Sequence, residues 1–122
     1  TTNNNDQTEQ GVQVDPTAGP VIVKVRYEID QCRTREFLDA IFALRRVRLR
    51  DGVRRWRLCQ DIEDDERWLE CFEFSSWADY LRFSSRRVVS DTAVRNAVLA
   101  VCRGNPVWSR HLERTAQSLA NT

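Results

Sequence analysis

The sequence lacks several features that would assign a function directly. No apolar run approaches the roughly 18 residues that a membrane-spanning helix requires, so this chain is not expected to cross a bilayer. No charged start is followed by an apolar run and a small-residue cleavage site, so we expect a cytoplasmic protein. There is also no glycine-rich phosphate loop and no paired-carboxylate motif, and we expect no cofactor.

Histidine and cysteine are equally sparse. The chain has one histidine, His111, and four cysteines that form no Cys-x-x-Cys motif and no cluster with the histidine. Zinc sites in proteins use such clusters, so we expect no metal. Reduced, partly buried thiols are the preferred interpretation of the cysteines.

Charge of one sign is not in excess. The 19 basic residues nearly balance 18 acidic ones, which leaves a net charge of +1 and gives no electrostatic drive toward nucleic acid. All but one of the basic residues are arginine, and the stretch LRRVRLRDGVRRWRL at residues 44–58 holds seven of them. On a helix, Arg45 and Arg48 share one face while Arg46 and Arg50 share another. The run therefore presents no continuous basic stripe, and we expect no nucleic-acid partner.

Hydrophobic periodicity divides the chain into regular elements. Residues 1–19 are polar and predict a disordered tail or linker, residues 20–113 a folded domain, and residues 114–122 a frayed tail. Alternating apolar residues predict strands at 21–30, 53–61, 67–75 and 107–112. Helical spacing predicts helices at about 32–50, from 76 to about 86, and from about 91 toward Gly104. Helix caps are expected at Asp30, at Ser76 with Asp79, and at Ser90 or Asp91.

The second and third strands are expected to form an antiparallel hairpin across the acidic turn at residues 62–66. If paired residues have numbers that sum to about 130, Cys59 lies opposite Cys71, and a cross-strand disulfide is conceivable. The same register places Arg57 opposite Glu73 as a cross-strand ion pair.

The order strand, helix, strand, strand, two helices, strand predicts an α+β fold. It is the ferredoxin-like βαββααβ plan with a four-stranded antiparallel sheet. Helices on one face leave the other face uncovered, and a second copy is the usual cover. We therefore expect a homodimer, a dimeric α/β barrel, with the candidate pocket in the crevice between sheet and helices.

From Pro20 to Glu113 the sequence resembles the soluble carboxy-terminal domain of bacterial major facilitator permeases of the transmembrane secretion effector type. The features carrying the resemblance are Tyr27, Asp30, Phe37-Leu38, Arg48, Arg50-Asp51-Gly52, Trp56, Asp61, Glu70, Ser76-Trp77 and Arg82. The resemblance extends to the antibiotic biosynthesis monooxygenase superfamily of dimeric α/β barrels. Tyr80 and Ser84 stand where the permease family often has histidine, so shared histidine chemistry is not implied. The chain is either a fragment of a permease, whose membrane-spanning part would be a partner, or a free-standing relative.

Two functions stay open at this point. The first, which the resemblance favours, is a non-catalytic dimerisation or ligand-sensing domain of an exporter. The second is a small cofactor-independent monooxygenase acting on an aromatic or polyketide-like substrate, with His111, Tyr80 and Trp56 as catalytic candidates. The four tryptophans line a pocket for an aromatic ligand or belong to the core and dimer interface. The ligand-binding candidates are Arg48, Trp56, Trp77, Tyr80 and Arg82.

Overall fold

The computed structural model describes residues 13–86 and 88–117. Its strands and helices fall where the periodicity of the sequence places them, and the boundaries differ by a few residues. In chain order they are β1 (Val21–Glu28), the 3-10 turn η1 (Gln31–Arg33), α2 (Thr34–Arg50), β2 (Arg54–Gln60), β3 (Arg67–Phe74), α3 (Trp77–Ser85), the 3-10 turn η2 (Val89–Asp91), α4 (Thr92–Val101) and β4 (Val107–Leu112).

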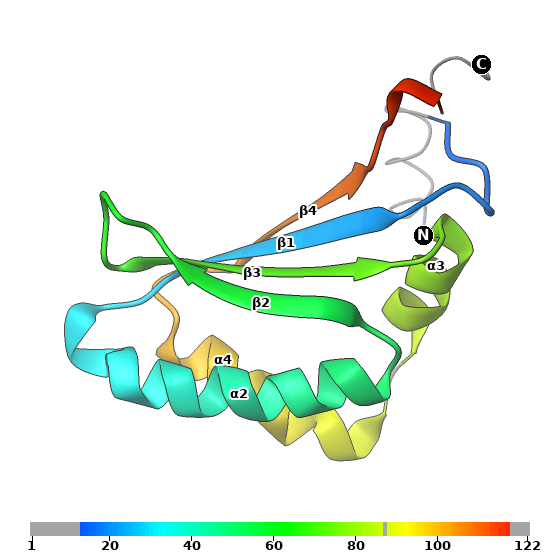
Figure 1. The fold of residues 1–122 in the computed structure, drawn as a ribbon. Coiled ribbons are helices and arrows are strands. Elements are labelled where there is room, and N and C mark those ends of the chain that lie inside the picture. The colour runs from blue at the N-terminus through cyan, green and yellow to red at the C-terminus, as the bar shows by residue number, and fades with distance from the viewer. Residues whose placement is uncertain (1–12, 87, 118–122) are drawn as a thin grey trace.

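The four strands form one antiparallel sheet in the order β2-β3-β1-β4. Figure 1 shows α2 and α4 side by side against one face of this sheet, with α3 at the end where β3 finishes. This is the ferredoxin-like arrangement, and the predicted α+β fold class is confirmed.

The core lies between the sheet and the two long helices. The helix-facing residues of β1 and β3 are buried, and α2 buries the stripe that its helical spacing predicted. Each large apolar side chain removed from water in this way contributes about 1.5–3 kcal/mol. The largest of these buried apolar side chains are Phe37, Phe72, Phe74, Ile29 and Ile41.

The opposite face of the sheet carries Lys24, Arg26 and Glu28 on β1, because successive side chains of a strand point to opposite faces. Within the described residues, no helix covers this face (Figure 1). None of the described helices is long and apolar enough to cross a membrane.

The register of the β2–β3 hairpin differs from the prediction by two residues. Cys59 pairs with Leu69, where the prediction placed Cys71. The Asp61 amide donates to the Arg67 carbonyl at 2.9 Å, so the centre of the turn lies one residue before the predicted centre. Cys71 is therefore diagonal to Cys59, and the predicted facing pair is wrong. All four cysteines are free thiols.

The predicted pairing of Arg57 with Glu73 is also wrong. Arg57 lies opposite Cys71, and a bulge between Arg54 and Arg57 inserts an extra residue into β2. Arg55 adopts a φ of 54° there, which turns the strand. Glu73 is instead approached by Arg54 at 3.9 Å and by Arg55 at 3.8 Å.

One of the predicted helix caps is formed. The Ser76 hydroxyl accepts a hydrogen bond at 3.2 Å from the backbone amide three residues on, as predicted for α3. Asp30 and Asp91 make no side-chain capping bond. Their carboxylates instead form ion pairs with arginines distant in sequence. Asp30 pairs with Arg103 at 2.5 Å, and Asp91 pairs with Arg50 at 2.5 Å.

Part of the predicted amino-terminal tail lies against α3. The Ala18 carbonyl accepts from the Trp77 amide at 2.8 Å and the Pro16 carbonyl from the Ala78 amide at 2.9 Å. These contacts satisfy amide groups at the start of α3 that have no partner inside the helix. Residues 1–12 and 118–122 of the two predicted tails lie outside the described residues.

Candidate functional site

A buried carboxylate organises the interior near the carboxy-terminal half of α2. Glu70 lies on the helix-facing side of β3 and is 0% exposed. The Arg48 guanidinium reaches it from α2 and donates from Nε to Oε2 at 2.7 Å and from Nη2 to Oε1 at 3.1 Å. This two-point geometry is the strongest form of an arginine–carboxylate contact.

Two neutral donors complete the coordination of Glu70. The Tyr27 hydroxyl donates to Oε1 at 2.7 Å, and the Trp56 indole Nε1 donates to Oε2 at 2.7 Å. Burial first and the Glu70 charge second raise the pKa of Tyr27 well above its usual range. Burial opposes the charged form of Arg48, but Glu70 outweighs it and raises the pKa of Arg48. Four hydrogen bonds from Arg48, Trp56 and the protonated Tyr27 therefore hold the Glu70 carboxyl group.

The other side of the Arg48 guanidinium faces aromatic rings. Its Cζ lies 5.1 Å from the ring centroids of both Phe72 and Trp108, and 5.9 Å from that of Phe83. Such cation–π contacts add about 0.5–2 kcal/mol when the cation is desolvated. Arg48 thus joins the Glu70 cluster to the aromatic wall of a cavity.

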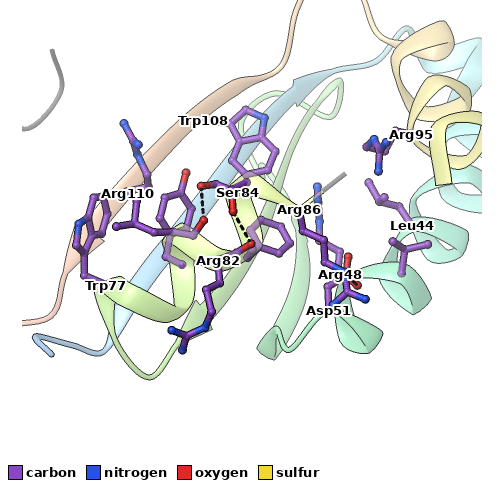
Figure 2. A pocket seen from close by; sticks show the side chains of 15 residues that line it. Leu44, Arg48, Asp51, Trp77, Arg82, Ser84, Arg86, Arg95, Trp108 and Arg110 are labelled. Carbon is purple, nitrogen blue, oxygen red and sulfur yellow. Dashed lines mark hydrogen bonds and ion pairs between the residues drawn. The ribbon is translucent and has the colours of Figure 1, made fainter. Parts of the chain in front are cut away.

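That cavity has a volume of about 780 Å³ and lies between the end of α2, α3, the start of α4 and β4. It is the crevice between sheet and helices that the fold predicted, and its volume is in the range of small-molecule sites. Figure 2 shows Trp77 and Arg110 toward one end and Leu44 and Arg95 toward the other. The lining residues are Leu44, Val47, Arg48, Asp51, Trp77, Tyr80, Leu81, Arg82, Phe83, Ser84, Ser85, Arg86, Arg95, Trp108 and Arg110.

Aromatic rings define one end of the cavity. Trp77 stacks on Tyr80 with ring centroids 5.2 Å apart and planes 23° apart. The Arg110 Cζ lies 5.7 Å from the Tyr80 ring centroid. Trp108, two residues before Arg110 on the same face of β4, is 44% exposed and so offers free ring surface. Flat surfaces of this kind favour a flat aromatic ligand.

The charge of the lining is unbalanced. Five arginines and one carboxylate, Asp51, border the cavity. Asp51 already has partners, because Arg50 lies 3.0 Å and Arg86 3.7 Å from its Oδ1.

Within residues 13–86 and 88–117, no group of three or more histidine, cysteine, aspartate or glutamate side chains is placed to hold a metal ion.

The structure brings four of the predicted ligand-binding residues to the cavity: Arg48, Trp77, Tyr80 and Arg82. The Arg82 side chain pairs with Asp79 and is 72% exposed, and Figure 2 shows it extending away from Trp108. Trp56, the fifth predicted residue, does not line the cavity. Its indole Nε1 donates to Glu70, the same buried carboxylate that Arg48 contacts.

His111 lies on the other face of the sheet. It pairs with Ile22 across the β1–β4 ladder, it is exposed, and its Nε2 is 3.0 Å from the Ser109 hydroxyl. The neighbouring Arg110 points to the helices because adjacent strand residues face opposite sides. The structure therefore does not bring His111 to the cavity.

Sequence reasoning missed Arg110 and Arg95 as lining residues. The alternation along β4 places Arg110 on the same face as Trp108, and that signal was sufficient to find it. No comparable sequence signal marks Arg95, which reaches the cavity from α4 because α2 and α4 pack together.

One family model matches the sequence. It is described as transmembrane secretion effector, and it covers residues 1–117. No curated protein matches the chain.

Solved structures share the fold at low identity. A variant of SnoaB, a cofactor-independent oxygenase from Streptomyces nogalater, has a TM-score of 0.67 and 14% identity, over 81% of this chain and 97% of that one. A protein assigned as an antibiotic biosynthesis monooxygenase, from Caulobacter crescentus CB15, has a TM-score of 0.68 and 13% identity, over 81% and 93%. A conserved protein from Methanosarcina mazei Go1 has a TM-score of 0.67 and 11% identity, over 81% and 97%. At these identities the likeness establishes the fold alone.

Proposed function

The chain belongs to the transmembrane secretion effector family, and from this premise we propose that it is a non-catalytic ligand-binding and dimerisation domain of an exporter. In this proposal it works at the cytoplasmic face of the membrane, beside the membrane-spanning part of the same permease. Binding of a small molecule in the cavity is its primary activity.

The observation that carries the proposal is the cavity of about 780 Å³ walled by aromatic rings. Trp77, which is half-buried and backed by the Tyr80 ring, and Trp108, which is 44% exposed, offer flat apolar surfaces on which an aromatic molecule can lie. We therefore propose a flat aromatic ligand.

The acid–base groups near the cavity support a binding role over a catalytic one. Asp51 is held by two arginines, and the Glu70 carboxylate accepts four hydrogen bonds from its neighbours. A general base must be free to take a proton from substrate. The single histidine, His111, lies on the far side of the sheet.

Calorimetric titration of the protein with flat bicyclic aromatics tests the proposal. Binding is expected in the wild type and is expected to weaken about tenfold or more in Trp108→Ala, since ring stacking contributes about 0.5–1.5 kcal/mol beyond area burial. Leu99→Ala is the matched control, because Leu99 is 51% exposed on α4 and does not line the cavity. Absence of heat with every aromatic compound would contradict the proposal.

We also propose that a second copy covers the open face of the sheet. The chain has the fold of dimeric α/β barrel proteins, and its described helices leave that face uncovered. Sedimentation at micromolar concentration is expected to give twice the 14.3 kDa of one chain. A single 14.3 kDa species would exclude the homodimer.

A cofactor-independent monooxygenase is the second candidate, because one structure of the same fold is a cofactor-independent oxygenase. Oxygen uptake with a panel of hydroxylated aromatics separates the two candidates. Turnover that is lost in Tyr80→Phe would favour the enzyme, whereas binding without oxygen uptake would favour the sensor.

A further inference from the structure

The arginines around the cavity indicate the charge of its ligand. The chain as a whole is nearly neutral, at +1, but the cavity gathers five arginines against one aspartate. We propose that the ligand is an aromatic acid whose carboxylate pairs with Arg110. This inference rests on the proposed binding function and specifies the chemical class of the ligand.

Arg110 is distinguished from the other four arginines by its surroundings. The others have acidic neighbours. Arg48 pairs with Glu70 and Arg82 with Asp79, Arg86 lies 3.7 Å from Asp51, and the charge of Arg95 helps to lower the pKa of Asp91. Arg110 has no ion pair with a carboxylate among residues 13–86 and 88–117. Its guanidinium Cζ lies 5.7 Å from the centroid of the Tyr80 ring.

The position of Arg110 makes an anion a favourable partner. It is half-buried on the helix-facing side of β4, opposite the fully buried Val23. A guanidinium that has lost part of its hydration gains more from a charge-assisted hydrogen bond than an exposed one does. Its planar fork matches the two oxygens of a carboxylate.

The rings beside Arg110 complete the recognition of an aromatic acid. Tyr80 lies under the guanidinium, and Trp77 is stacked on Tyr80. Trp108 shares the inward face of β4 with Arg110 (Figure 2). A ligand whose carboxylate reaches Arg110 therefore has aromatic surface next to it for its ring system. A neutral aromatic molecule of the same shape gains the stacking and lacks the ion pair.

Naphthalene-1-carboxylate and 1-naphthamide test this directly, because they share one shape and differ in charge. Calorimetric titration of the wild type is expected to show the carboxylate bound about 10- to 100-fold more tightly, which is the effect of a hydrogen bond to a charged group. Arg110→Gln is expected to remove this preference. Arg35→Gln is the matched control, since Arg35 is exposed on α2 and does not line the cavity, and it is expected to keep the preference.

The remaining outcomes would overturn the inference, and they show whether the proposed binding function fails with it. Equal binding of the two compounds, or a carboxylate preference that survives in Arg110→Gln, would overturn the aromatic acid and leave the proposed binding function standing. Binding of neither compound, nor of any other aromatic compound tested, would overturn both. Near-ultraviolet circular dichroism of Arg110→Gln shows that a loss of preference comes from a folded protein.

Discussion

The Nε atom of Arg48 lies 2.7 Å from Oε2 of Glu70 inside the core, and Arg48 also lines the cavity. This pair explains one arginine of the basic run at residues 44–58. Arg48 faces inward and pairs with the buried Glu70 carboxylate, whereas Arg45 and Arg46, beside it in sequence, are exposed. The run is therefore a mixture of one core residue and a largely solvated surface.

Breaking this pair is expected to destabilise the fold strongly. Arg48→Met or Glu70→Gln should each lower the free energy of unfolding by about 3–5 kcal/mol, because each leaves a buried polar or charged group without its partner. Urea denaturation measures the change. The double variant Arg48→Met with Glu70→Gln should lose less than the sum of the two single losses, since both charges are gone. Additive losses would show that the two groups do not interact.

Trp56 is expected to affect stability and to leave ligand binding unchanged. Trp56→Phe removes the indole donor to Glu70, and the unmet acceptor should cost about 1–3 kcal/mol in urea denaturation. Because Trp56 does not line the cavity, the affinity for naphthalene-1-carboxylate should stay within twofold by calorimetry. A loss of affinity at unchanged stability would instead make Trp56 a ligand contact.

Asp91 is expected to confer stability that depends on pH. The hydrogen bond from Arg50 lowers the pKa of Asp91 below its usual range. A carboxylate whose pKa is lower in the folded state stabilises the fold above its unfolded pKa of about 3.9, and this stability is lost as pH falls through the folded pKa. Thermal melts should therefore show Asp91→Asn less stable than wild type at pH 7, with the difference shrinking below about pH 4.

A constant difference between wild type and Asp91→Asn from pH 7 to pH 3 would contradict that account. Asp39→Asn serves as the control, because Asp39 is exposed on α2. It should melt like the wild type throughout.

His111 is expected to be dispensable for both stability and aromatic binding. It is exposed on the sheet face away from the cavity. Surface substitutions of this kind change stability by about 0.5 kcal/mol or less. His111→Ala should match the wild type in urea denaturation at concentrations where the chain is monomeric, and in calorimetric titration with naphthalene-1-carboxylate. A loss of binding would place the ligand elsewhere than in the cavity.

Local patterns in the sequence were sufficient to predict the strands and helices. The alternation of β1 and the helical stripe of α2 report which side chains meet the core, and that information is local. The register of β2 and β3 was not accessible in this way. It depends on the turn closed by Asp61 and Arg67 and on the bulge at Arg55, which alternation does not encode.

The same limit applies to long-range charge pairing and to the site. Asp30 and Asp91 have the local character of helix caps, but Arg103 and Arg50 reach them only after the chain folds. Arg48 was found through the family resemblance. Arg95 comes to the cavity only through the packing of α4 on α2, and a single sequence does not predict that contact.

The four tryptophan indole N–H signals in a proton–nitrogen NMR spectrum test the central claim most directly. Trp77 and Trp108 line the cavity, whereas Trp68 lies in the core and Trp56 is bonded to Glu70. Titration with naphthalene-1-carboxylate is predicted to move the signals of Trp77 and Trp108 and to leave that of Trp68 in place. Unmoved signals for Trp77 and Trp108 at saturating ligand would contradict the assignment of this cavity as the binding site.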